Sequence, residues 1–231
     1  MNTGKKIAIL QSNYIPWKGY FDIINSVDEF IIFDDAQYTK NDWRNRNQLK
    51  TKNGLMWLTI PIKQSFGQKI REAQTSNPKW RKKHWRSISE NFSSSPYFNN
   101  YRQTFEELYL NSNETYLSKI NFLFITAICN ILNIETKISW SMEYDILPDK
   151  NKRLISICEQ AGASSYLSGP SAKDYIDESI FEEAGIHLTF MDYSNYPEYH
   201  QQHPPFTHFV SVIDLLFNEG PKASNYMKSF Q

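Results

Sequence analysis

One histidine of this chain combines the residue type and the surroundings of a general base. Residues 79–86 contain five cationic side chains and a single histidine, His84. On a helix, its four-residue spacing from Trp80 and from Ile88 places the three side chains on one face. Nearby positive charge and partial burial both lower the pKa of an imidazole and keep it neutral at pH 7. We therefore predict His84 as the general base, with His200 as the second choice.

A pair of carboxylates, Asp34 and Asp35, ends an apolar run that predicts a buried strand over residues 29–34. In open α/β sheets, ligands bind just beyond the carboxyl ends of the strands. Adjacent carboxylates at such a place orient a base, hold a metal ion, bind sugar hydroxyls, or simply cap a turn. No third carboxylate or histidine lies nearby in the sequence, so we predict no metal site. Asp35 is the predicted residue that orients the base or the sugar.

Amide, aromatic and cationic side chains follow the first two predicted strands. Amides bind sugar hydroxyls or a developing oxyanion, and aromatic rings cover a base or a sugar ring. On an extended segment, Arg44 and Arg46 point the same way and can clamp a diphosphate; the alternative is a solvated loop with surface charges. The predicted substrate-binding residues of this region are Gln11, Tyr14, Trp17, Tyr20, Gln37, Arg44, Asn45 and Arg46.

A further phosphate-binding element is predicted where a short strand over residues 165–167 ends. The chain continues as Ser168-Gly169-Pro170-Ser171 and then as a mostly helical segment over residues 173–183. A strand that runs into a helix in this way exposes backbone N–H groups to an anion. Ser171 serves equally well as a helix N-cap, and the Walker sequence is absent. Ser168, Ser171 and Lys173 join the predicted substrate-binding residues.

The basic helix around His84 also predicts a docking surface. Its cations Arg81, Lys82 and Lys83 suit an acidic carrier protein or the phosphates of a ligand. The alternative is a solvated basic face. Two further histidines, His200 and His203, lie three residues apart but precede two prolines, so a helical metal site is not predicted there.

Apolar runs and helical periodicities alternate along the chain. Strands are predicted over residues 6–10, 29–34, 55–60, 136–139, 165–167 and 186–191. Helices are predicted over residues 20–26, 80–92, 101–110, 115–132, 151–161 and 210–218. This alternation favours an α/β fold, a mostly parallel sheet flanked by helices. The length of 231 residues fits a single domain over 1–231, with a helical insertion or subdomain around 79–133.

The loop after the first strand resembles, and departs from, that of the nucleotidylyltransferases. Those enzymes open with a similar strand, loop and helix and carry Pro-x-His-x-Gly-His in the loop. This chain has Pro16-Trp17-Lys18-Gly19-Tyr20 instead. Tryptophan and tyrosine cannot act as the cations that bind phosphates during nucleotidyl transfer. We interpret this as a nucleotidyltransferase-like, Rossmann-like core whose chemistry has changed.

Bulk composition excludes several classes of protein. Lys and Arg total 25 and so do Asp and Glu, so the net charge is zero and a global nucleic-acid footprint is absent. Cys129 and Cys158 lie in apolar helical segments, which predicts two buried free thiols. No signal peptide and no apolar stretch long enough for a membrane span is found. We expect a cytoplasmic protein without membrane insertion.

Taken together, the motifs resemble those of the WbqC-like family, bacterial proteins encoded in clusters for O-antigen and other surface polysaccharides. The resemblance spans essentially the whole chain, and its combination of motifs is specific. In the first third of the chain these are Gln11-x-x-Tyr14-x-Pro16-Trp17-x-Gly19-Tyr20-Phe21, Asp34-Asp35-x-Gln37-Tyr38, Trp43-x-Asn45-Arg46 and Trp57-Leu58-x-x-Pro61. Further on they are Trp80-x-x-x-His84, Tyr166-Leu167-Ser168-Gly169, Tyr199-x-Gln201 and Ser211-x-Ile213-Asp214-Leu215-Leu216-Phe217-Asn218.

The resemblance implies a transferase that places an aminoacyl group such as glycine, or another acyl group, on the amine of a nucleotide-linked amino sugar. No tightly bound cofactor is expected, and the acyl donor is a thioester on a carrier protein or on coenzyme A. Two alternatives stay open. One is nucleotidyl transfer from ATP or CTP on the same architecture. The other is a non-catalytic subunit that binds a sugar nucleotide. The sequence does not define an oligomeric state.

Overall fold

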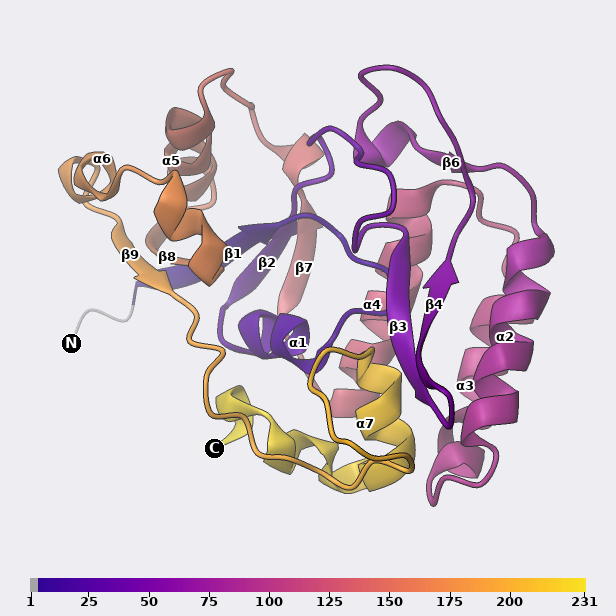
Figure 1. The fold of residues 1–231 in the computed structure, drawn as a ribbon. Coiled ribbons are helices and arrows are strands. Elements are labelled where there is room, and N and C mark those ends of the chain that lie inside the picture. The colour runs from indigo at the N-terminus through magenta and orange to yellow at the C-terminus, as the bar shows by residue number, and fades with distance from the viewer. Residues whose placement is uncertain (1–3) are drawn as a thin grey trace.

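The computed structural model describes residues 4–231 and has a five-stranded sheet at its centre (Figure 1). Its strands are β1 (Lys5–Leu10), β2 (Glu29–Ile32), β7 (Lys137–Trp140), β8 (Ala163–Ser168) and β9 (His187–Phe190). They lie in the order β7-β2-β1-β8-β9, and each neighbouring pair is parallel. A parallel sheet covered by helices is the doubly wound α/β architecture with a Rossmann-like core, which confirms the predicted fold class.

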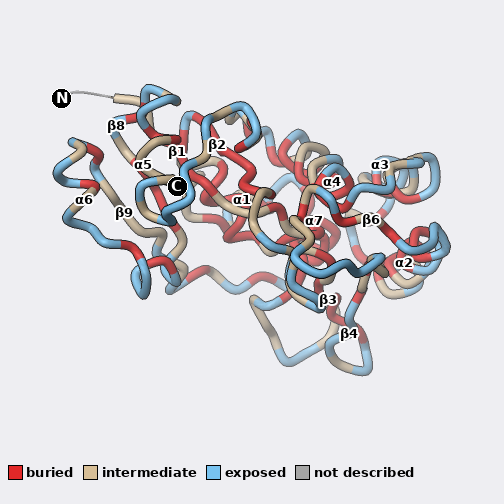
Figure 2. The backbone as a smooth tube through the Cα atoms, turned by 90° about the horizontal axis from the view of Figure 1, so that it is seen from above, coloured by how far each residue is buried: buried red, intermediate tan, exposed pale blue. Residues whose placement is uncertain are grey.

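Side chains of the central strands alternate between two hydrophobic cores, one on each face of the sheet. On β1, Ile7 and Ile9 enter the core that α5 (Lys150–Gln160) and α6 (Glu178–Glu183) cover, and Ala8 enters the other. On β2 the same alternation sends Phe30 and Ile32 to one side and Ile31 to the other. Because both faces are covered, residues 7–10 of β1 and residues 30–32 of β2 are continuous apolar runs rather than alternating in polarity. Figure 2 shows the backbone of β1 and β2 buried in the interior.

The larger core lies under a group of helices on the second face. These are α1 (Lys18–Asn25), α2 (Lys79–Phe92), α3 (Phe98–Leu110), α4 (Leu117–Leu132) and α7 (Val212–Glu219). Helices α2 to α4 follow one another without a strand between them, and they share one apolar cluster with α1 and α7. No helix within residues 4–231 combines the length and the apolar character that a bilayer span requires.

Two small hairpins extend this side of the molecule. β3 (Arg46–Thr51) pairs with β4 (Gly54–Thr59), and β5 (Ile62–Lys63) pairs with β6 (Gln74–Thr75). Strand β3 was not among the predicted strands, because its sequence RNQLKT contains no apolar run. Its pairing with β4 and the burial of alternate side chains stabilise it instead. The β3–β4 hairpin fixes the position of the polar chain segment that precedes β3.

Five short 3₁₀ helices complete the described chain. They are η1 (Ile70–Glu72), η2 (Ser141–Glu143), η3 (Pro170–Asp174), η4 (Gly220–Tyr226) and η5 (Lys228–Phe230). The predicted helical segment over 173–183 is therefore wrong in its first half. The chain forms η3, breaks at Tyr175, and starts α6 only after Asp177, whose carboxylate accepts a hydrogen bond from the backbone N–H of Ser179. An aspartate N-cap of this kind sets the start of a helix.

The strand order reverses at β1. From β1 the chain passes through α1 to β2 and later to β7 on one side, whereas β8 and β9 lie on the other side. The loops that follow β1 and β8 consequently diverge toward opposite faces of the sheet. In doubly wound folds, this divergence opens a crevice outside the carboxyl ends of the two strands, where ligands bind.

Candidate ligand-binding site

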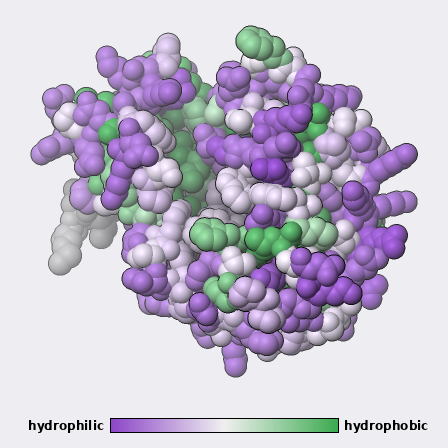
Figure 3. Space-filling model, viewed as in Figure 1, coloured by the Kyte–Doolittle hydropathy of each residue, from purple (hydrophilic) through white to green (hydrophobic). Residues whose placement is uncertain are grey.

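A cavity of about 780 Å³ occupies this switch point, at the carboxyl ends of β1 and β8. Its floor is apolar and includes Ile9, Leu10 and Phe33. In Figure 3 it forms a recess with hydrophobic residues at its depth and hydrophilic residues along its rims. Its volume falls within the range of pockets that hold small molecules.

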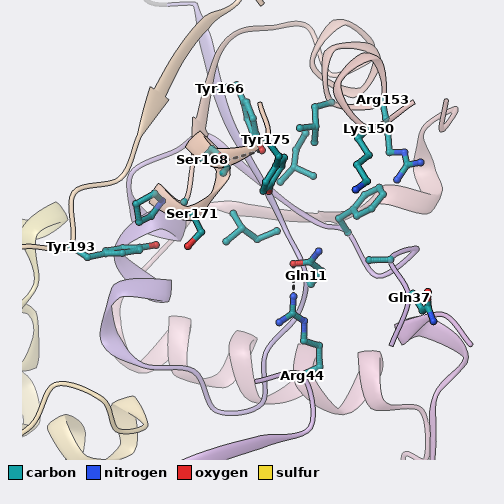
Figure 4. Close-up of a pocket in the computed structure, with 18 residues that line it drawn as sticks. Gln11, Gln37, Arg44, Lys150, Arg153, Tyr166, Ser168, Ser171, Tyr175 and Tyr193 are labelled. Atoms are coloured by element: carbon teal, nitrogen blue, oxygen red, sulfur yellow. Dashed lines mark hydrogen bonds between the residues drawn. The ribbon is translucent and has the colours of Figure 1, made fainter. Parts of the chain in front are cut away.

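Cationic side chains converge on this cavity from two directions. Lys150 and Arg153 come from the first turn of α5, and Arg44 comes from the turn before β3, facing them across the cavity (Figure 4). The lining contains no aspartate, glutamate or histidine. A partly enclosed site with one sign of charge raises the local concentration of ligands of the opposite sign. The cavity therefore favours an anion.

Hydrogen bonds to neighbouring groups fix the orientation of the guanidinium groups of Arg153 and Arg44. Arg153 donates from Nε to the carbonyl of Leu147 at 2.8 Å and from Nη2 to the carbonyl of Pro148 at 2.7 Å. Arg44 donates from Nη2 to the side-chain oxygen of Gln11 at 2.9 Å and from Nη1 to a carboxylate of Asp42 at 2.8 Å. Side chains already fixed in place lose less entropy when a ligand binds. Both arginines are thus prepared for an anionic group.

A buried polar network beneath the cavity holds this arrangement together. Asp34 accepts hydrogen bonds from the backbone N–H of Ser12 at 2.8 Å, from its hydroxyl at 2.7 Å, and from the hydroxyl of Ser118. Asn121 donates to the Ser12 hydroxyl at 3.0 Å and to the backbone carbonyl of Arg44 at 2.9 Å. Burial raises the pKa of Asp34 above its ordinary value, although these hydrogen bonds oppose the shift. The network ties the β1 loop, the end of β2 and α4 to the cavity arginine.

Aromatic side chains form the walls. Tyr166, Tyr175 and Tyr193 line the cavity, and the ring of Trp17 lies 4.9 Å from that of Tyr193, centre to centre, in an edge-to-face contact. Tyr20 donates from its hydroxyl to the backbone carbonyl of Gln11 at 2.9 Å. The two aromatics that replace the histidines of the nucleotidylyltransferase loop therefore support cavity residues from behind rather than line the cavity.

The structure brings five of the predicted substrate-binding residues together in this cavity. They are Gln11, Gln37, Arg44, Ser168 and Ser171. Their roles in binding remain predictions, but their convergence follows from strand order alone, because the loops after β1, β2 and β8 meet at one edge of the sheet.

The cavity residues Lys150, Arg153, Tyr175 and Tyr193 were not predicted from the sequence. The helix over 151–161 was predicted, but its packing across the switch point was not. The sequence feature that could have indicated two of these residues is the spacing of Lys150 and Arg153. They lie three residues apart at the start of a helix directly before a central strand.

His84 lies outside the cavity, in a closed aromatic cluster beneath α2. The ring is 3% exposed, its Nδ1 lies 2.9 Å from the hydroxyl of Tyr14, and that hydroxyl lies 2.6 Å from the hydroxyl of Tyr109. Trp80 contacts the ring from one side at 5.2 Å between centres. Burial lowers the pKa of His84 to about 3, with a smaller contribution from the charge of Lys83. The ring is therefore neutral, as predicted, but neither it nor Tyr14 lines the cavity.

The predicted pair of arginines is divided between two places. Arg44 reaches the cavity, whereas the guanidinium carbon of Arg46 lies 4.0 Å from the centre of the Trp57 ring. The two do not share one extended segment, because Arg44 lies in the turn before β3. Asn45 is buried and donates to the backbone carbonyl of Ile60 at 2.9 Å. Arg46 and Asn45 thus stabilise the β3–β4 hairpin and do not line the cavity.

The remaining predicted residues also lie elsewhere. Asp35 forms ion pairs at 2.9 Å with both Lys69 and Arg71, which lower its pKa although burial opposes the shift. His200 is exposed and donates its backbone N–H to Glu219 at 3.1 Å. The ammonium group of Lys173 lies 5.2 Å from the centre of the Phe190 ring. None of these predicted residues lines the cavity.

The three cations of the predicted docking surface on the basic helix do not share one environment. Arg81 is buried and donates to the backbone carbonyl of Glu114, whereas Lys82 and Lys83 are exposed. Both cysteines, Cys129 and Cys158, are free and buried, as predicted. Within residues 4–231, no group of three or more His, Cys, Asp or Glu side chains is placed to hold a metal ion.

The fold is thus a doubly wound α/β fold with a cation-lined cavity at its switch point, the place where proteins of this architecture bind ligands. The chain belongs to the WbqC-like protein family, whose profile matches residues 11–226. It is 47% identical over 226 residues to the uncharacterized protein Rv1507c of Mycobacterium tuberculosis (strain ATCC 25618 / H37Rv), a match that covers 97% of this chain and 98% of that relative. No solved structure matches the chain.

Proposed function

We propose that this chain is a transferase that acylates the amine of a nucleotide-linked amino sugar bound in the switch-point cavity. One observation carries the proposal: the cavity at the carboxyl ends of β1 and β8 collects Arg44, Lys150 and Arg153 and has no carboxylate in its lining. The resemblance of the motifs to the WbqC-like family adds the acyl transfer and the sugar acceptor.

The cations account for the diphosphate of such a ligand. A guanidinium binds phosphate oxygens through two parallel N–H bonds, and it does so best when its fork is already oriented. Arg153 is oriented by the carbonyls of Leu147 and Pro148, and Arg44 by Gln11 and Asp42. Lys150, at the exposed start of α5, adds a third charge.

The walls account for the remainder of the ligand. Tyr175 and Tyr193 provide flat aromatic surface for a nucleoside base or a sugar ring. Gln11, Gln37 and Ser168 provide amide and hydroxyl groups that exchange hydrogen bonds with sugar hydroxyls. This combination of a mostly apolar floor with few polar groups is typical of small-molecule sites.

The same charges favour the chemical step. A nearby positive charge disfavours an ammonium group, so the bound sugar amine loses its proton to solvent more readily than it does in water. The neutral nitrogen then forms a bond to the thioester carbonyl carbon, and the carbon–sulfur bond breaks. The proton released from nitrogen is balanced by the one that the leaving thiolate takes up. Donors in the cavity stabilise the oxyanion of the tetrahedral intermediate.

Product analysis tests the proposal. The protein is incubated with amino sugars linked to uridine or thymidine diphosphate and with acetyl or glycyl thioesters of coenzyme A. The mass of the nucleotide sugar is then measured by mass spectrometry. A gain of one acyl mass that is lost in Arg153→Ala and retained in Lys82→Ala supports the proposal. Binding of the nucleotide sugar without any acyl product points instead to a non-catalytic binding subunit.

Nucleotidyl transfer is the second candidate, because its known enzymes share the strand–loop–helix opening and the cavity holds cations suited to a triphosphate. It predicts release of pyrophosphate from ATP or CTP in the presence of Mg²⁺. That result without any acyl product would replace the first proposal.

A further inference from the structure

A second cavity, of about 640 Å³, lies on the same edge of the sheet, beyond the end of β7. It is bounded by η1, the start of α4, the end of β7 and η2. Its lining includes the aromatic and apolar side chains of Tyr116, Trp140 and Met142 and the cations Arg71 and Lys119. None of the sequence motifs assigned to substrate binding lies in its lining.

One chain segment, residues 34–37, borders both cavities. Ala36 and Gln37 line the first cavity. Asp34 accepts a hydrogen bond from Ser118, and Asp35 pairs with Arg71 at 2.9 Å; both of these partners line the second cavity. Because a two-substrate transfer must bring two ligands to neighbouring sites, this adjacency makes the second cavity the natural place for the other substrate.

The second cavity differs from the first in chemistry. It exposes large apolar side chains, since Met142 is 51% exposed and Tyr116 is 37% exposed. Lys119 stands at its rim with its ammonium group 5.5 Å from the centre of the Tyr116 ring, and within residues 4–231 it forms no ion pair. The single carboxylate of the lining, Glu72, accepts a hydrogen bond from the backbone N–H of Lys69.

An apolar groove with an unpaired cation at its rim fits a slender apolar chain that ends in an anion. A phosphopantetheine arm has this form, because its aliphatic and amide-bearing chain carries a phosphate at one end and a thiol at the other. Exposed apolar side chains stabilise such a chain by removing its surface from water, and the ammonium group stabilises the phosphate.

We infer that the second cavity binds the phosphopantetheine arm of the acyl donor. The inference rests on the proposed function, since it assigns a place to the thioester that the transfer requires. Trp140 and Met142 contact the chain, Lys119 binds the phosphate, and the thioester end lies toward the segment 34–37 and the sugar amine beyond it.

Calorimetric titration tests this with two probes, 4′-phosphopantetheine and coenzyme A. Lys119→Ala removes the charge that binds the phosphate, and Met142→Glu places a carboxylate against the apolar chain, and each is expected to raise the Kd about tenfold. Both side chains are exposed, so the variants should keep the wild-type melting midpoint. Lys52→Ala, at the exposed β3–β4 turn, is the control and should bind as wild type does.

The two probes separate the two sources of the arm. Equal affinity for both supports recognition of the arm alone, as on a carrier protein, and clearly tighter binding of coenzyme A supports coenzyme A as the acyl donor. No binding of either probe to the wild-type protein, with or without a nucleotide sugar, overturns the inference, and so does binding that neither substitution weakens.

A parallel titration with a nucleotide-linked amino sugar keeps this test distinct from that of the proposed function. Lys119→Ala and Met142→Glu should leave that affinity unchanged. Phosphopantetheine binding that depends on Lys119, without any binding of nucleotide sugars, would support the second cavity and overturn the sugar acceptor.

Discussion

The switch-point cavity and the cluster around His84 contain similar kinds of side chain but differ in their access to solvent. In the cluster, His84 is 3% exposed and Tyr14 is fully buried, and their polar atoms bond to one another and to Tyr109. In the cavity, the Nη1 of Arg153 has no hydrogen-bond partner among residues 4–231 and Lys150 is exposed. Residues capable of chemistry therefore indicate a site only where the fold leaves their polar atoms without partners and open to a ligand.

Removal of the His84 imidazole should give the largest effect of the substitutions considered. The effect should be on stability and not on ligand binding. His84→Ala leaves a void among aromatic rings and an unpaired hydroxyl on Tyr14, which should cost about 2–4 kcal/mol of unfolding free energy. Chemical denaturation measures this cost, and nucleotide-sugar affinity should stay within about twofold of wild type. The matched control is the exposed His200, whose change to alanine should shift stability by less than about 0.5 kcal/mol. A stable His84→Ala protein without turnover would restore His84 as the predicted general base.

Acid should destabilise the cluster more than the cavity. The pKa of His84 is about 3 in the folded protein because of burial, against about 6.5 for a solvated histidine. Between these values the unfolded chain binds the extra proton, so the contribution to stability is complete above pH 6.5 and is lost as the pH falls toward 3. The loss approaches about 1.4 kcal/mol per pH unit and totals about 2.3 kcal/mol from pH 6.5 to 4.5, because half of the unfolded chains carry an uncharged histidine at pH 6.5.

Denaturation curves at pH 6.5 and 4.5 measure this slope. His84→Gln removes the titrating group, so its stability should fall less over the same interval than that of the wild-type protein. Parallel curves for the two proteins would show that His84 accepts a proton in the folded state at pH 4.5, and that the cluster is open to solvent.

Disrupting the buried network beneath the cavity should lower both stability and nucleotide-sugar affinity, each by an intermediate amount. Asn121→Ala removes the bonds to Ser12 and to the carbonyl of Arg44, so it should cost about 1–2 kcal/mol of stability. It should also weaken nucleotide-sugar binding by about three- to tenfold, because Arg44 loses its fixed position. Asn130→Ala, at an exposed position of the same helix, is the control. Lower stability with unchanged affinity would restrict Asn121 to a structural role.

The exposed cations of α2 should give the smallest effect. Lys82→Ala and Lys83→Ala remove charges that do not line the cavity, so stability should change by less than about 0.5 kcal/mol. Affinity for a nucleotide sugar should also stay within about twofold. Titration at low salt is the sharpest check, because any long-range attraction is largest there. A clear loss of affinity would mean that the ligand site extends to α2.

The sequence predicted the central sheet well and the site in part. Ile7, Ile9 and their neighbours form short apolar runs bounded by polar loops, and this pattern is sufficient to place buried parallel strands. Strand β3 was not predicted, because its burial depends on its partner strand β4. Gln11 and Ser171 were predicted because they follow strands, and strand order brings such residues together. Arg44 was predicted as one of two arginines that could clamp a diphosphate, and of the two it alone lines the cavity.

The other site residues depend on information that local pattern does not contain. Lys150 and Arg153 reach the cavity only because α5 packs across the switch point. For His84, the apolar face that it shares with Trp80 and Ile88 indicated burial more strongly than access, since all three side chains are buried. Periodicity marks the inward face of a helix, but it does not tell whether that face borders a core or a cavity.

The most direct test of the central claim is calorimetric titration of a nucleotide-linked amino sugar into the wild-type protein and into the Lys150→Ala/Arg153→Ala variant. We expect binding to the wild-type protein and a Kd raised by about ten- to hundredfold in the variant, with the melting midpoint nearly unchanged. Equal affinity of the two proteins, or no binding to the wild-type protein, would contradict the claim that the switch-point cavity is the ligand site.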